Sequence, residues 1–189
     1  KWKLYNATET VGGYNSNTYI DAANKQVAIT FEGTSPNSEL STWVLSKDGL
    51  TDVEIGWHIP NQVVEGYERF KTLIAEVQNT YGSQGYGISL AGHSLGGGLA
   101  QMMAGMYFVD TGVALPTLAE EGPGMLRQIQ IYAEQQLIEG KMIHLPTGGT
   151  IQLTGSLVDR ANEAKAIVNT FKAQDFSNVV NVLTEQDVV

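Results

Sequence analysis

One serine in a glycine-rich pentapeptide is the residue of this 189-residue chain best suited to chemistry. Residues 92–96 read Gly-His-Ser-Leu-Gly, a G-x-S-x-G pattern between an apolar run at 86–91 and helical periodicity from Leu95 onward. A serine on such a strand-to-helix turn has an exposed hydroxyl, and backbone N–H groups beside it can stabilise an oxyanion. The pattern predicts that Ser94 is a nucleophile and that the Leu95 N–H lines an oxyanion hole. The alternative is an ordinary glycine-rich turn.

The chain also resembles the fungal-type (class 3) lipase family, which includes bacterial and phospholipase A1-like relatives. The resemblance rests on residues 29–34 (Ile-Thr-Phe-Glu-Gly-Thr), 90–100 (Leu-Ala-Gly-His-Ser-Leu-Gly-Gly-Gly-Leu-Ala) and 184–189 (Thr-Glu-Gln-Asp-Val-Val). It implies a serine hydrolase that cleaves lipid acyl esters through an acyl-enzyme, as a triacylglycerol lipase or a phospholipase. It implies a lipid or ester substrate and no cofactor.

Two further site residues follow from this resemblance. Thr34 matches the second oxyanion donor of the family, although Glu32 stands where the family commonly has arginine. Asp187 matches the acid that orients the catalytic histidine after the last strand. The alternatives are that Thr34 is a plain turn residue and Asp187 a surface carboxylate, with Asp159 and Asp175 as weaker candidates for the acid.

The catalytic base is the difficulty, because the chain has only three histidines, His58, His93 and His144. The chain order of α/β-hydrolases is serine, acid, histidine, which calls for a histidine after Asp187. The given sequence ends at Val189, so we expect a hydrolase domain cut before the segment that carries this histidine. His144 is the one remaining candidate, and it would break the expected order.

An apolar segment between residues 34 and 57 contains Leu40, Trp43, Val44 and Leu45. The resemblance implies that it forms a lid, and that opening the lid brings apolar surface into transient contact with a membrane or lipid interface. The alternative is a short helix packed in the core.

Hydrophobic periodicity predicts an α/β fold in which strands and helices alternate. The resemblance specifies an α/β-hydrolase with a central, mostly parallel sheet and helices on both faces. We expect one domain over residues 1–189, with 120–171 as an insertion because Ser94 and Asp187 lie far apart for the family. The expected strands are residues 18–20, 26–31, 86–91, 113–118 and 179–183, with a small hairpin of 141–145 and 150–154; the expected helices are 61–81, 95–109, 125–139 and 157–171.

Composition excludes several classes of protein. Eleven basic against 20 acidic residues give a net charge of −9, which argues against a nucleic-acid partner. Without cysteine there is no disulfide or thiolate metal site, and the scattered histidines form no metal motif. We expect a secreted, bacterial protein, although no signal peptide is present in the given sequence. The oligomeric state is left open.

Two other functions compete with ester hydrolysis. A catalytically incomplete lipid- or protein-binding module could use the same fold, since fold does not imply function. A peptidase or thioesterase could use the same catalytic residues.

Overall fold

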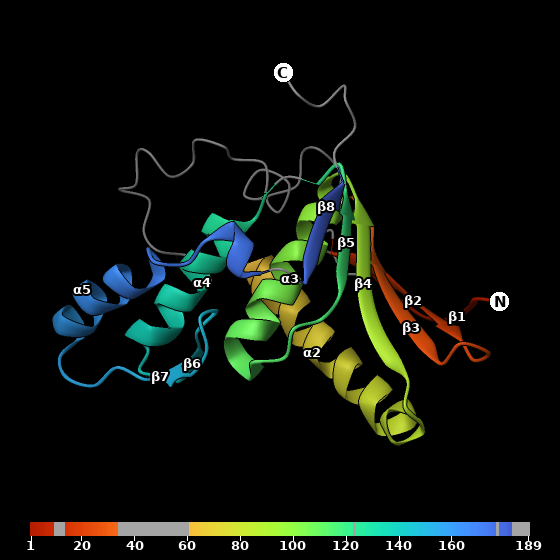
Figure 1. Ribbon diagram of the computed structural model, residues 1–189, viewed down its shortest axis with the longest axis horizontal. Coiled ribbons are helices and arrows are strands. Elements are labelled where there is room, and N and C mark those ends of the chain that lie inside the picture. Colours follow the sequence, from red (N-terminus) through yellow and green to blue (C-terminus); the bar gives the residue numbers. More distant parts are fainter. Residues whose placement is uncertain (10–13, 34–60, 123, 177, 183–189) are drawn as a thin grey trace.

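The computed structural model describes residues 1–9, 14–33, 61–122, 124–176 and 178–182. Its main feature is a six-stranded mixed sheet in the order β1-β2-β3-β4-β5-β8 (Figure 1). The first three strands are antiparallel neighbours, whereas β3, β4, β5 and β8 run parallel. The strands are β1 (Lys3–Glu9), β2 (Asn15–Asp21), β3 (Gln26–Phe31), β4 (Gly87–His93), β5 (Thr117–Glu120) and β8 (Val179–Val182).

Two helices connect the parallel strands, as their alternation in the sequence predicts. Helix α2 (Asn61–Tyr81) lies between β3 and β4 along the chain, and α3 (Leu95–Thr111) lies between β4 and β5. Parallel neighbours require such crossovers, because a short turn cannot return the chain to the same end of the sheet. The α/β fold with a mostly parallel sheet is therefore confirmed.

Both helices pack on one face of the sheet. Strand β3 points Val27, Ile29 and Phe31 into this core, where each is at most 3% exposed. Helix α3 contacts four strands of this sheet and also α2 and α4 (Leu126–Ile138), so nearly all of its side chains are buried. Helix α2 buries most of the apolar stripe predicted from its periodicity, namely Val63, Tyr67, Phe70, Ile74 and Val77, while its last member, Tyr81, is half-buried.

The chain between β5 and β8 forms a separate group of elements that packs outward from α3. It comprises α4 (Leu126–Ile138), a hairpin of β6 (Ile143–His144) and β7 (Thr150–Ile151), and α5 (Leu157–Val168). Helix α4 packs on α3, and α5 packs on α4 on the side away from the sheet (Figure 1). That residues 120–171 are an insertion remains a prediction. The described residues also contain two short 3-10 helices, η1 (Gly82–Gln84) and η2 (Ala173–Asp175).

Several element boundaries differ from those predicted, and one strand was not predicted. Strand β5 starts at Thr117 instead of Val113, because Gly112 ends α3 at φ 72° and Pro116 has no N–H to donate. Helix α5 ends at Val168, one turn earlier than its apolar spacing indicates. The edge strand β1 was not predicted, because its sequence lacks a regular apolar alternation.

The opposite face of the sheet carries Ala91, Leu118 and Val180. Leu118 is 49% exposed and Val180 54%. None of the helices in the described residues covers this face (Figure 1), so helices on both faces remain an expectation of the family fold. Within the same residues, no helix is both long and apolar enough to cross a membrane.

Candidate active site

Ser94 lies on a strained turn at the carboxyl end of β4. Its backbone has φ 53° and ψ −125°, in a region that non-glycine residues rarely adopt. Its N–H donates to the Glu120 carbonyl of the neighbouring strand at 2.8 Å, which fixes the turn to β5. The side chain is exposed, as a nucleophile requires.

Glycines permit the close crossing of β4, β3 and the start of α3. A Cβ atom added to Gly92 would lie 2.1 Å from the Gly96 carbonyl oxygen. One added to Gly96 would lie 2.2 Å from the Phe31 carbonyl oxygen. Real Cβ atoms do not approach backbone this closely, so both positions of the pentapeptide require glycine for packing.

The first turn of α3 is available to an anion. Serine before a helix ordinarily caps it by accepting an N–H bond, but Ser94 makes no side-chain cap. The first N–H groups of a helix have no acceptor within the helix, and its dipole favours negative charge there. The Leu95 N–H therefore lies where an oxyanion formed at Ser94 could accept it.

The end of β3 lies against this turn. A Cβ atom at Gly33 would be 3.8 Å from Leu95 Cβ and 3.9 Å from the Gly96 nitrogen. The next residue, Thr34, lies outside the described residues, as do His58, Asp187 and the segment with Leu40, Trp43, Val44 and Leu45. Their roles remain predictions.

The end of β5 brings two glutamates beside Ser94. The Glu121 carboxylate lies 3.2 Å from His93 Nε2, and Glu121 has a positive φ of 52°. Sequence reasoning missed it, although two acidic residues directly before Gly122 at the end of a strand were a visible signal.

The other candidates for the catalytic base and acid lie away from Ser94. His144 contacts the end of α3, since a Cβ atom at Gly112 would be 2.7 Å from its ring. The 17 residues of α3 span about 25 Å, which separates His144 from Ser94. Asp159 lies in α5, which packs on α4, and Asp175 lies in η2, before the start of β8, at the edge of the sheet opposite the carboxyl end of β4. The structure therefore does not bring any of these three to Ser94.

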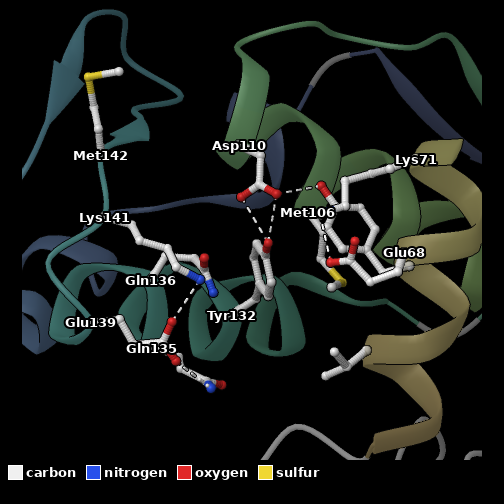
Figure 2. A pocket seen from close by; sticks show the side chains of 12 residues that line it. Glu68, Lys71, Met106, Asp110, Tyr132, Gln135, Gln136, Glu139, Lys141 and Met142 are labelled. Carbon is white, nitrogen blue, oxygen red and sulfur yellow. Dashed lines mark hydrogen bonds and ion pairs between the residues drawn. The ribbon is translucent and has the colours of Figure 1, made fainter. Parts of the chain in front are cut away.

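Two cavities lie near opposite ends of α3. A smaller one of about 260 Å³ lies beside the turn and is lined by Thr30, Phe31, Ala91, Gly92, His93, Leu118 and Glu120. A larger one of about 380 Å³ lies between α2, α3 and α4 around Asp110, near the other end of α3 (Figure 2). The smaller cavity includes His93, the residue before Ser94, whereas Ser94 itself lines neither of the two. The described residues contain no cluster of His, Asp or Glu that could hold a metal ion.

Comparison with known proteins identifies relatives for this arrangement. The sequence profile of the lipase (class 3) family matches residues 23–120, which include β3, α2, the turn and β5. No curated protein matched the chain. Among solved structures, the chain is similar to the triacylglyceride lipase of Rhizomucor miehei, with 16% identity, TM-score 0.46 and coverage of 68% of this chain and 53% of that one. The chain is also similar to a lipase from Yarrowia lipolytica, with 18% identity, TM-score 0.45 and coverage of 65% of this chain and 47% of that one. The chain thus spans about half the length of these lipases.

Proposed function

The chain belongs to the class 3 lipase family, and from this premise we propose that the protein is a serine hydrolase of lipid acyl esters. The observation that carries the proposal is the conformation of Ser94, an exposed serine at positive φ directly before a buried helix that its side chain does not cap. A structural turn has no need of this arrangement, since glycine would adopt the same φ without strain. A nucleophile needs both the exposed hydroxyl and the nearby N–H donors.

In the proposed mechanism, Ser94 Oγ attacks the ester carbonyl and a histidine beyond the given sequence takes its proton. Asp187 orients that histidine, while the N–H groups of Leu95 and Thr34 stabilise the tetrahedral oxyanion. Loss of one such donor costs about 3 kcal/mol of activation free energy. The alcohol leaves with the proton from the histidine, and water then hydrolyses the acyl-enzyme by the same route in reverse.

The substrate is proposed to approach from a lipid surface. Leu40, Trp43, Val44 and Leu45 form the proposed lid, whose opening exposes apolar side chains to the interface. The cavity of about 260 Å³ that includes His93 offers apolar contact from Ala91 and Leu118 on the open face of the sheet. Activity that rises when an ester substrate passes its solubility limit supports the lid, and a smooth saturation curve across that limit argues against it.

Labelling with a fluorophosphonate tests the nucleophile directly. We expect the full-length protein to be labelled at Ser94, and Ser94→Ala to abolish both labelling and ester hydrolysis. Ser83→Ala, which removes an exposed serine from η1, is the matched control and should leave both unchanged. Labelling that survives Ser94→Ala contradicts the assignment.

Activity and binding assays of the full-length protein distinguish the competing functions. Turnover of triacylglycerol, phospholipid, thioester and peptide substrates by the full-length protein separates lipase from phospholipase, thioesterase and peptidase activity. Binding to lipid vesicles without labelling or turnover would favour the non-catalytic module.

A further inference from the structure

Three consecutive residues at the end of β5 contact three parts of the turn around Ser94. The Glu120 carbonyl accepts the Ser94 N–H at 2.8 Å. The Glu121 carboxylate lies 3.2 Å from His93 Nε2. A Cβ atom added to Gly122 would lie 2.8 Å from the Gly97 carbonyl carbon, so the two chains are in close contact there.

Glu121 holds an unfavourable backbone conformation in this position. Its φ of 52° places a non-glycine residue in the left-handed region. The next residue is a glycine, which adopts positive φ without this steric cost. Strain of this kind persists only where the surroundings hold it, and it clusters at functional sites. Its carboxylate contacts His93, the residue directly before the proposed nucleophile.

The two contacts hold two neighbouring groups, the peptide between His93 and Ser94 and the His93 side chain. The Glu120 carbonyl fixes the N–H of the peptide between His93 and Ser94. When His93 carries a proton on Nε2, that group donates to Glu121 and holds the imidazole on β5. Rotation about the Cα–C bond of His93 would turn the Ser94 N–H away from the Glu120 carbonyl, and a shift of His93 would break the contact with Glu121. The position of the Ser94 side chain depends on where His93 and this peptide lie.

We propose that Glu121 is a positioning residue for Ser94, acting through His93. The proposal rests on the proposed function, since it assigns Glu121 a part in holding the nucleophile. It touches no reacting atom in this role. Its effect is therefore expected on the rate of attack by Ser94 rather than on substrate binding, because a small misplacement of a reacting group slows chemistry without removing contacts to substrate.

Variants at Glu121 in the full-length protein separate the carboxylate from the backbone strain. Glu121→Ala removes the carboxylate and keeps a side chain at positive φ, Glu121→Gly also relieves the strain, and Glu121→Gln keeps an acceptor of the same length. Lys25→Gly is the matched control, because Lys25 has a φ of 51° in the turn between β2 and β3.

Amide hydrogen exchange of Ser94 and kinetics on a soluble ester are the two readouts. For Glu121→Ala and Glu121→Gly we expect Ser94 exchange to rise and kcat to fall, each by about 5-fold, the upper end for a contact between partly exposed groups. KM should stay within about 2-fold of the parent value. Glu121→Gln should restore most of both losses, and Lys25→Gly should change neither.

The outcomes separate this proposal from the proposed function. Ser94 exchange and kcat that stay within about 1.5-fold in Glu121→Ala overturn the positioning role, even if fluorophosphonate labels Ser94. A parent protein that is not labelled overturns the proposed function, and Ser94 exchange alone then decides whether Glu121 holds the turn. Losses in Glu121→Ala that Glu121→Gln leaves unrestored also contradict the proposed hydrogen bond.

Discussion

The turn around the candidate nucleophile contains both glycines and non-glycine residues with a strained backbone. Ser94 and Glu121 both have φ values near 50°, while Gly92 and Gly96 leave no room for a side chain. The two kinds of residue serve different purposes, because glycine permits close packing whereas a strained serine gains an exposed hydroxyl. At the scale of single residues, the geometry of the turn is thus determined by van der Waals contact with backbone atoms.

Gly96→Ala tests this packing. The added methyl group would lie 2.2 Å from the Phe31 carbonyl oxygen, so a strand or the helix must move. We expect the free energy of unfolding to fall by about 4 kcal/mol, or the protein to be insoluble. Gly124→Ala is the control, since no atom lies within 4 Å of its added Cβ. Urea denaturation of both variants measures the difference, and equal midpoints would contradict the close crossing.

Helix α4 shows how an element can bury polar groups between two helices. It packs against α3 and α5, and its buried side chains include Gln128, Gln130, Glu134 and Gln136. Glu134 is only 1% exposed, and its Oε1 has no partner among the described residues. Burial raises the pKa of Glu134, although the charges of Arg127 and Lys165 oppose this. Ionised Glu134 therefore destabilises the packing of α4.

Glu134→Gln should stabilise the protein near neutral pH. A raised pKa in the folded state means that folding favours the protonated form, so this contribution is lost as pH rises through the folded-state pKa. The amide has no charge to lose, so we expect about 1 kcal/mol more stability at pH 7.5 and little difference below about pH 4. Urea denaturation at both pH values measures this, with exposed Glu163→Gln on α5 as control. Destabilisation at pH 7.5 would contradict it.

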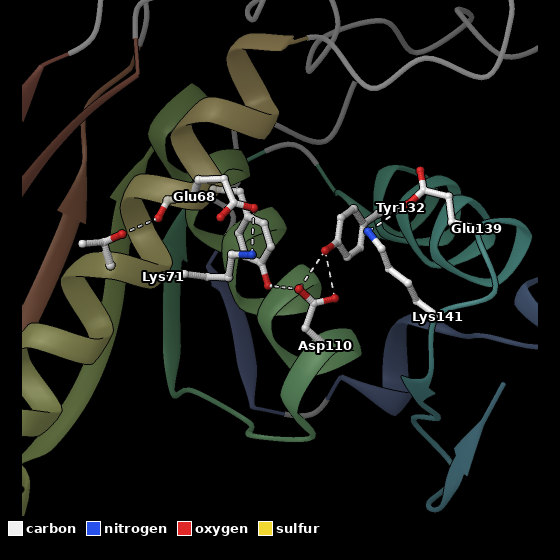
Figure 3. Close-up of polar contacts among 8 residues, drawn as sticks. Glu68, Lys71, Asp110, Tyr132, Glu139 and Lys141 are labelled. Carbon is white, nitrogen blue, oxygen red and sulfur yellow. Dashed lines mark hydrogen bonds and ion pairs between the residues drawn. The ribbon is translucent and has the colours of Figure 1, made fainter.

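At the scale of the whole molecule, polar contacts join three helices near the end of α3 that is opposite Ser94. Asp110 accepts hydrogen bonds from Tyr67 of α2 and Tyr132 of α4, each at 2.8 Å (Figure 3). Burial raises the pKa of both tyrosines, and the negative charge of Asp110 raises them further. Three helices are thus tied at one point about 24 Å along α3 from the candidate site.

These two tyrosines make the free energy of unfolding depend on pH in the alkaline range. In the unfolded chain they ionise near pH 10, while in the folded protein they stay protonated to higher pH, so stability falls above pH 10. Tyr67→Phe and Tyr132→Phe should each cost about 2 kcal/mol at pH 8, and the difference should shrink above pH 10. Urea denaturation at pH 8 and 10.5 measures both effects. Tyr5→Phe, at a 41% exposed position, is the control, and equal losses at both pH values would contradict the linkage.

Local patterns in the sequence determined the elements and the candidate nucleophile. Helix α2 runs from Asn61 to Tyr81 as its apolar spacing predicts, and the pentapeptide lies at the junction of β4 and α3. These predictions succeed because periodicity and turn chemistry depend on residues within a few positions of one another. The resemblance to class 3 lipases also came from short motifs, whereas the roles of Thr34 and Asp187 remain predictions.

Tertiary structure alone decided which distant residues meet. His93 and Glu121 are 28 residues apart, and they come together because β4 and β5 pair in one register. His144 was a possible base until the fold placed it at the far end of α3. Asp110 gave no signal in the sequence, since its tyrosine partners are 43 and 22 residues away. Such contacts depend on strand register and helix packing, which no local pattern specifies.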